Sequence, residues 1–214
     1  MDLVHNHSSS SSIPVSDISP ILQLASRSPR RRELLEQIGV RYTVVDATVD
    51  EARSVDEPAD DYVLRLARAK ARAGYAVASG APTLGADTIV VLGEDALGKP
   101  CNKAAAMAML RRMSATSHWV FTAVALYDGN RLESVIVKTE VYFKALSDDL
   151  IARYWDTGEP KDKAGSYGIQ GMGAIFVDRI EGSYSGVVGL PLTETSELCQ
   201  RFGIKSWNLA VTGS

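Results

Sequence analysis

The sequence has few cysteines and no long apolar run. Cys101 and Cys199 are its only 2 cysteines, and their separation fits neither a metal-binding cluster nor a disulfide framework. No apolar run reaches the ~18 residues that a membrane-spanning helix needs, and the N-terminal segment lacks the apolar stretch of a secretory signal. We therefore expect a cytoplasmic protein with no membrane partner.

The sequence also lacks an excess of basic residues. Its formal net charge is -3 and its pI is about 5.7, which argues against a broad nucleic-acid-binding surface and allows only a local basic pocket. Hydrophobic residues make up 45% and charged residues 23% of the chain, as is usual for a globular protein. We expect no nucleic-acid partner.

The chain contains no internal repeat and no long linker. Residues 1–19 include the serine run 8–12, and this composition predicts a disordered tail. His5 and His7 lie in the same stretch, where a floppy tail is favoured over a metal site. Residues 20–207 are expected to form one folded domain.

Strand-like and helix-like segments alternate in the first half of the sequence, and Asp128-Gly129 marks a hairpin in the middle. Ser28 and Pro29 suit the start of a helix that Gly39 ends. Strands are expected at 21–25, 42–45, 83–92, 120–127, 131–143, 174–180 and 187–190, and helices at 29–38, 60–78, 102–113, 147–158 and 191–202. This alternation predicts an α/β fold with a mixed, twisted sheet and flanking helices.

Three consecutive arginines occupy the first turn of the helix expected at 29–38. Arg30 and Arg31 lie four residues before Leu34 and Leu35, so they continue the apolar face of that helix. Arg32 is expected to point to solvent. Cations at a helix N-terminus oppose the helix dipole, and inward-facing ones need an anion. A phosphate group would satisfy both arginines and the free backbone N–H groups together.

A carboxylate and a lysine are also expected to point inward. In the strand at 83–92, Asp87 shares a face with Ile89 and Val91, where an unpaired charge is costly. It is a candidate base or metal ligand, and a turn or capping role is the alternative. Lys70 continues the apolar stripe of the helix at 60–78, although snorkelling to the surface is favoured for a lone lysine.

The remaining candidates are ambiguous by pattern alone. Lys99 suits a turn, Asp50 and Glu51 are either loop charges or metal ligands, and the lone His118 is more often structural. The segment DKAGSYGIQGMG predicts a loop whose backbone comes close to another group. No glycine cluster matches a Walker A or a dinucleotide-binding fingerprint.

Several long motifs, in order, resemble the Maf family of nucleoside triphosphate pyrophosphatases. They are LASRSPRRRELLEQIG, VDE, RLARAKA, LGADTIVVL, LGKP, FTAVAL, EPKDKAGSYGIQGMGA and VVGLPL, spread over residues 22 to about 200. The resemblance implies two lobes around a nucleotide cleft and makes 20–207 the catalytic domain. It implies hydrolysis of a nucleoside triphosphate to a monophosphate and pyrophosphate, with Mg²⁺ or Mn²⁺ as cofactor.

Roles for individual residues follow from the same resemblance. Asp87 is implied as the proton acceptor, and Glu51 and Asp87 as metal ligands. Glu51 and Lys99 join Asp87 as catalytic residues. The implied substrate-binding residues are Ser26, Ser28, Arg30, Arg31, Lys70, Thr88, Lys163 and Gln170.

Three of these positions separate subgroups of the family. Arg30, Thr88 and Gln170 resemble the set carried by the dTTP/UTP group, with modified pyrimidine nucleotides as further candidate substrates. The alternatives are a pyrophosphatase for 7-methyl-GTP or other modified nucleotides, and a non-catalytic nucleotide-binding regulator of cell division. The oligomeric state is left open, with a homodimer as one option.

Overall fold

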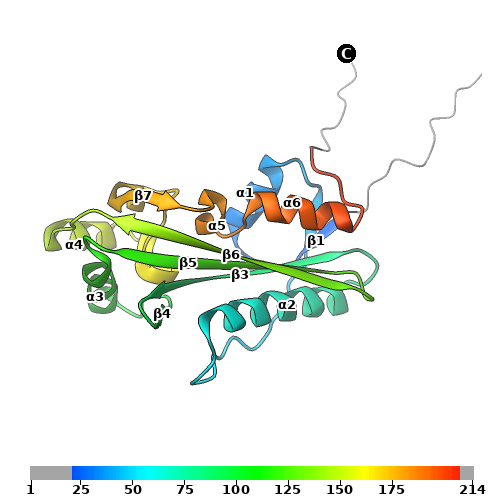
Figure 1. Cartoon of the computed structure of the whole chain (residues 1–214), viewed down its shortest axis with the longest axis horizontal. Helices are drawn as coiled ribbons and strands as arrows, with labels where there is room; N and C mark the ends of the chain where they lie inside the picture. Colours follow the sequence, from blue (N-terminus) through cyan, green and yellow to red (C-terminus); the bar gives the residue numbers. More distant parts are fainter. Residues whose placement is uncertain (1–20, 208–214) are drawn as a thin grey trace, which may run out of the picture.

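The computed structural model describes residues 21–207; the tail predicted over 1–19 lies outside them. A seven-stranded sheet runs through the described part (Figure 1), in the order β2-β1-β3-β5-β6-β7 with β4 added beside β3. The strands are β1 (Leu22–Leu24), β2 (Tyr42–Val44), β3 (Thr83–Leu92), β4 (Asp95–Leu97), β5 (Ser117–Tyr127), β6 (Leu132–Phe143) and β7 (Val177–Glu181).

The sheet is mixed, as the sequence predicts. β1 pairs in parallel with both β2 and β3, whereas β3, β5, β6 and β7 pair in antiparallel fashion. The hairpin of β5 and β6 turns at the predicted Asp128-Gly129, where Asp128 Oδ1 accepts from the backbone N–H groups of Asn130 and Arg131. The division into two lobes stays a prediction.

Helices cover both faces of the sheet. In Figure 1, α2 lies against one face, while α1, α5 and α6 lie on the other. The helices are α1 (Pro29–Gln37), α2 (Ala59–Val77), α3 (Lys103–Met113), α4 (Asp148–Asp156), α5 (Tyr184–Val188) and α6 (Leu192–Arg201). Among residues 21–207, no helix has the length and apolar character to cross a membrane.

Side chains on the two faces of β3 pack into different hydrophobic clusters. Ile89 and Val91 pack with Val63 and Ala67 of α2, as expected for side chains two residues apart on one face of a strand. On the opposite face, Leu84 and Ala86 join a cluster with α1 and α6, and Val90 joins a second cluster with α3 and α4. Thr88 therefore lies on that face between two apolar clusters.

Three predicted strands differ from the structure. The strand expected at 120–127 begins earlier, at Ser117. The segment 187–190 is wrong as a strand: α5 occupies Tyr184–Val188, and the Ser183 side chain caps it by accepting from Gly186 N at 3.0 Å. A short apolar run does not distinguish a buried helix from a strand. The strand expected at 174–180 begins only at Val177, after a 3₁₀ turn over Met172–Phe176. β4 has no counterpart among the predicted strands.

Candidate active site

The site lies where one edge of β3 has no neighbouring strand. β1 pairs with β3 only at Thr83 and Leu84, and β4 pairs with it only from Val90 onward. A cavity of about 960 Å³ lies beside this gap. Nine of the predicted site residues line it: Ser26, Ser28, Arg30, Arg31, Glu51, Lys70, Asp87, Thr88 and Lys99.

Lys70 joins two carboxylates on one side of this cavity. Its Nζ atom lies 2.7 Å from Asp87 Oδ1 and 2.7 Å from Glu51 Oε1. The side chains of Lys70 and Asp87 are each 14% exposed, whereas that of Glu51 is 60% exposed. The structure thus confirms that Lys70 and Asp87 point inward, and it places Glu51 at the rim.

A glycine brings the helix and the strand that carry this pair close together. A Cβ atom at Gly85 of β3 would lie 3.0 Å from the carbonyl carbon of Lys70, and closer still to the backbone of Ala67 and Ala71. Any larger residue would push α2 away from β3. Gly85 therefore lets Lys70 reach Asp87 two residues further along the strand.

The two carboxylates titrate differently although they share a lysine. Burial raises the pKa of Asp87 above its ordinary value, and the nearby charges of Lys70 and Arg31 only partly oppose this. The hydrogen bond from Lys70 lowers the pKa of Glu51. The difference follows from burial, because an exposed carboxylate loses little hydration when it pairs. Asp87 thus binds a proton more readily than an exposed aspartate does.

Arg31 lines the same cavity as Asp87 and is held by three acceptors. Its guanidinium donates to Gly189 O at 2.9 Å, Ser26 Oγ at 3.1 Å and Thr88 Oγ1 at 3.2 Å. Burial lowers its pKa, and the charge of Asp87 partly restores it. The predicted inward orientation of Arg31 is confirmed.

The hydroxyl of Thr88 belongs to a directed chain of hydrogen bonds. Thr122 Oγ1 donates its one proton to Gly186 O at 2.7 Å, so the contact of 3.0 Å between Thr88 and Thr122 has Thr88 as the donor. The remaining lone pairs of Thr88 then accept from Arg31. Because Thr88 and Asp87 are adjacent on a strand, their side chains lie on opposite faces of the sheet.

The prediction that Arg32 points to solvent is wrong. Its side chain is half-buried, and the Nε atom is buried without a hydrogen-bond partner. Its terminal nitrogen donates weakly to Arg27 O at 3.4 Å. Arg27, which precedes α1, therefore contacts this side chain, and helical spacing alone does not reveal that contact. Arg32 lines neither of the cavities described here.

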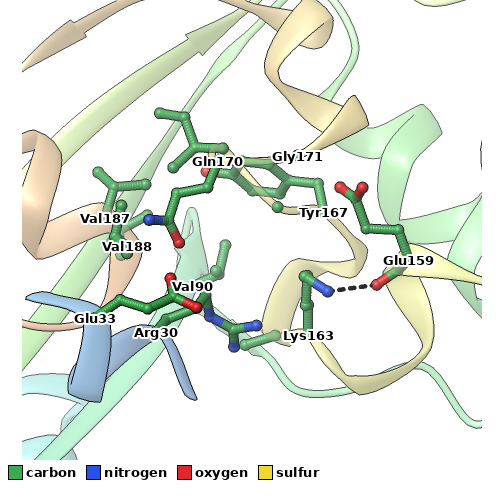
Figure 2. A pocket seen from close by; sticks show the side chains of 14 residues that line it. Arg30, Glu33, Val90, Glu159, Lys163, Tyr167, Gln170, Gly171, Val187 and Val188 are labelled. Atoms are coloured by element: carbon green, nitrogen blue, oxygen red, sulfur yellow. Dashed lines mark hydrogen bonds between the residues drawn. The ribbon is translucent and has the colours of Figure 1, made fainter. Parts of the chain in front are cut away.

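A second cavity, of about 310 Å³ (Figure 2), adjoins the first, because Arg30, Ala164 and Val188 line both. The two remaining predicted residues, Lys163 and Gln170, line it, and Arg30 lines both cavities. Apolar side chains from β3, β5 and α5 form part of its wall: Val90, Val120, Val187 and Val188. Lys163 donates from Nζ to Glu159 O at 2.6 Å and to Asp162 Oδ1 at 2.9 Å.

Several residues of the site were not singled out by the sequence. Glu159 lines the smaller cavity and Tyr62 the larger one, where the Tyr62 hydroxyl donates to Glu51 O at 2.9 Å. Glu159 stands just before the glycine-rich segment, whose backbone was predicted to approach another group. That prediction is confirmed, because a Cβ at Gly171 would lie 2.6 Å from Glu159 Cδ.

Candidate metal ligands are few in the described part of the chain. No group of three or more His, Cys, Asp or Glu side chains with metal-binding geometry occurs within residues 21–207. Glu51 and Asp87 are two carboxylates with one shared partner, Lys70. His118 is 1% exposed and lines neither cavity, and its Nε2 atom bonds at 2.8 Å to Tyr167, which lines the smaller cavity.

The fold and the site define an α/β protein with a cationic cleft that contains a buried carboxylate and adjoins a smaller, partly apolar cavity. A family model described as "Maf-like protein" matches residues 21–202. The chain belongs to the Maf-like protein family.

Curated relatives are similar over most of their length. A dTTP/UTP pyrophosphatase of Pseudoalteromonas atlantica is 52% identical over 188 residues, covering 86% of this chain and 98% of the relative. Proteins of the same name from Escherichia coli O157:H7 and Hahella chejuensis are 52% and 50% identical, covering 85% and 87% of this chain and 92% and 94% of their own.

Proposed function

We propose that this protein is a pyrophosphatase that hydrolyses dTTP and UTP to the nucleoside monophosphate and pyrophosphate. One observation carries the proposal: a cavity lined by cations and a buried carboxylate adjoins a smaller, partly apolar cavity that contains Gln170. The first suits a triphosphate and the second a base. The names of the curated relatives support the same activity.

The larger cavity offers several cations to the phosphate chain. Arg31 is fixed by three acceptors, Arg30 lies between the two cavities, and Lys99 is exposed at the rim. Ser26 and Ser28 stand at the N-terminus of α1, where free backbone N–H groups favour an anion. These groups would hold the triphosphate and stabilise the charge that develops on its oxygens.

Asp87 is placed to accept the proton of the attacking water. In the proposed step, the water oxygen bonds to phosphorus, the α–β phosphoanhydride bond breaks, and the water proton passes to the Asp87 carboxylate. The raised pKa of Asp87 makes it a stronger base than an exposed aspartate. Lys70, held between Asp87 and Glu51, would fix the orientation of both carboxylates.

The donor set also fits a divalent metal cofactor, Mg²⁺ or Mn²⁺. Mg²⁺ is commonly bound through one or two carboxylates together with substrate phosphates, and Asp87 and Glu51 line the cavity proposed for the phosphates. When bound, the ion would neutralise part of the phosphate charge.

Gln170 is proposed to read the base. Uracil and thymine present an N3–H donor between two carbonyl acceptors, and a neutral amide offers both a donor and an acceptor to that edge. The valines of the smaller cavity supply apolar surface for the ring. Lys163 lies in the same cavity with Arg30, where the base and the phosphates would meet.

A reducing, cytoplasmic setting is part of the same proposal. Cys101 is exposed and Cys199 is buried, and both are free thiols. The homodimer stays an expectation, which sedimentation of the purified protein would decide.

The test is a panel of triphosphates with released pyrophosphate as the readout. Wild-type protein with Mg²⁺ or Mn²⁺ is expected to prefer dTTP and UTP over CTP, GTP and 7-methyl-GTP, and chelation with EDTA is expected to abolish release. The Gln170→Glu variant should lower the UTP to 7-methyl-GTP ratio of kcat/KM, because guanine presents two donors that suit a carboxylate.

Three outcomes would contradict the proposal in different ways. Preferred hydrolysis of 7-methyl-GTP would make this chain a pyrophosphatase for modified nucleotides. Tight UTP binding without pyrophosphate release would make it a regulator. An unchanged ratio in Gln170→Glu, with both rates lowered equally, would remove Gln170 from base recognition while leaving the activity in place.

A further inference from the structure

Glu159 stands beside the proposed base-binding residue without belonging to the phosphate side of the site. It follows Gly158 at the end of α4 and begins a 3₁₀ turn over Glu159–Asp162. Its side chain lines the smaller cavity together with Gln170 (Figure 2) and does not line the larger cavity that contains Asp87. Its side chain therefore lies on the side of the site proposed for the base.

The Glu159 carboxylate accepts three hydrogen bonds. Two come from the backbone of the loop that carries Gln170: Met172 N donates to Oε2 at 2.8 Å and Gly173 N donates to Oε1 at 3.2 Å. The third comes from the Tyr154 hydroxyl, which donates to Oε1 at 2.8 Å. Both oxygens are thus committed to neighbouring groups of the protein itself.

The loop wraps closely around this carboxylate. A Cβ atom would lie 3.1 Å from Oε1 if placed on Gly168 and 2.6 Å from Cδ if placed on Gly171. These two glycines flank Gln170 on either side. The Tyr154 hydroxyl links the loop to the carboxylate a further time, because it donates to Glu159 and also accepts from Gly168 N at 3.1 Å.

The ionised form of Glu159 matches the three hydrogen-bond donors around its carboxylate. Burial alone would raise its pKa, but the hydrogen bonds from Met172 N, Tyr154 and Gly173 N outweigh burial, so the pKa lies below its ordinary value. An ionised carboxylate only accepts, whereas a glutamine would turn an N–H₂ group toward one of these donors.

We propose that Glu159 is a positioning residue for base selectivity, which holds the loop 168–173 so that Gln170 presents its amide to the base. This inference rests on the proposed function, because it assigns to Gln170 the reading of the pyrimidine edge. It extends the proposal to a carboxylate whose three hydrogen bonds come from the protein itself. The geometric basis is that Tyr154 bonds Gly168 at one end of the loop, while Glu159 bonds the backbone of Met172 and Gly173 at the other end.

The test compares Glu159→Gln with Tyr154→Phe, which removes only a hydroxyl. Both variants are expected to lower kcat/KM for UTP roughly tenfold, as the loss of a hydrogen bond to a charged group suggests, with a smaller loss for GTP. Inhibition by inorganic tripolyphosphate, which probes the phosphate side alone, is expected to stay unchanged. Glu57→Gln is the matched control, since Glu57 is hydrogen-bonded by Arg65 and lines neither cavity.

A double-mutant cycle then separates positioning from a general structural role. In a Gln170→Ala background, Glu159→Gln should cause no further loss of UTP selectivity, because residues that act as a unit are not additive. Equal losses for UTP, GTP and tripolyphosphate, or full additivity in the cycle, would overturn the inference.

Failure of the proposed function would give a different result. Wild-type protein would then release no pyrophosphate from UTP. In that case the ratio of the Kd values for UTP and GTP, measured by calorimetry, takes the place of the kinetic ratio. Faster hydrogen exchange of the Met172 and Gly173 amides in Glu159→Gln would support the holding role, and unchanged exchange would refute it.

Discussion

Lys70 and Asp87 form an ion pair of 2.7 Å in which each side chain is only 14% exposed. The same ammonium group lies 2.7 Å from Glu51 at the rim. One cation therefore serves two carboxylates, and the inner carboxylate keeps a raised pKa despite the pair. A raised pKa means that this carboxylate binds a proton more readily than an exposed aspartate does. It also means that the ionised form lowers the stability of the folded protein.

Replacing Asp87 by asparagine should abolish most of the activity while the fold survives. The loss of a general base costs ~10²–10⁴-fold in kcat. Asp60→Asn is the matched control, because Asp60 pairs with Lys138 at 2.9 Å and lines neither cavity. Pyrophosphate release from UTP is the measurement. More than about a tenth of the wild-type kcat in Asp87→Asn would show that Asp87 is not the base.

The same variant should be more stable than wild type at neutral pH. The pKa of Asp87 is raised on folding, so the folded state binds the proton more tightly and ionisation opposes folding. Asparagine carries no charge to bury. The difference in free energy of unfolding between the variant and wild type should disappear as the pH falls toward ~3.9, the ordinary aspartate pKa. Denaturant midpoints at pH 7 and pH 4 test this, and a less stable variant at pH 7 would contradict it.

Periodicity indicated the direction of two side chains in this part of the site, although it favoured snorkelling for Lys70 taken alone and left a turn or capping role open for Asp87. Asp87 alternates with Ile89 and Val91 on β3, and Lys70 continues the stripe of Val63 and Ala67 on α2. Both predictions rest on local geometry, in which strand and helix spacing fix the direction of a side chain. The elements that carry these residues lie within a residue or two of the predicted bounds.

Contacts between distant segments could not be predicted in this way. The chain beside α1 that half-buries Arg32, the carbonyl of Gly189 that accepts from Arg31, and the loop around Glu159 all depend on tertiary packing. The apolar Val187–Val188 run fits either a buried strand or a helix, and only packing against β5 and β6 decides between them.

Arg31→Ala should impair catalysis far more than Arg32→Ala. Arg31 reaches into the larger cavity with three fixed hydrogen bonds, whereas Arg32 lines neither cavity. A charge-assisted contact to phosphate contributes ~1.5–3 kcal/mol, which is roughly ten- to a hundredfold in kcat/KM for UTP. Equal losses in the two variants would refute the assignment of Arg31 to the phosphates.

Thr88→Val should weaken hydrolysis of every triphosphate by a similar factor. The Thr88 hydroxyl accepts from Arg31 at 3.2 Å and donates to Thr122 at 3.0 Å, so its loss frees the arginine. Thr88→Ser keeps the hydroxyl and should restore most of the activity. The measurement is kcat/KM for UTP and for GTP in both variants. If Thr88→Val changed only the ratio of kcat/KM for UTP to kcat/KM for GTP, Thr88 would contact the base directly.

His118 should make the protein less stable in mild acid. It is 1% exposed, it is the only histidine within residues 21–207, and burial lowers its pKa from 6.5 to about 4. The unfolded chain therefore takes up a proton that the folded protein does not bind, and stability is lost as the pH falls from 6.5 toward 4. Between pH 7 and pH 5 this loss amounts to about 2 kcal/mol.

His118→Phe isolates that contribution. Phenylalanine keeps the edge-on ring contacts with Phe143 and Tyr167, although it leaves the Tyr167 hydroxyl without its partner and lowers stability at every pH. The relevant quantity is the change in free energy of unfolding between pH 7 and pH 5, measured by urea denaturation. We expect wild type to lose about 2 kcal/mol more than the variant over this interval. Parallel losses in the two proteins would show that His118 is protonated as readily in the folded state as in the unfolded chain.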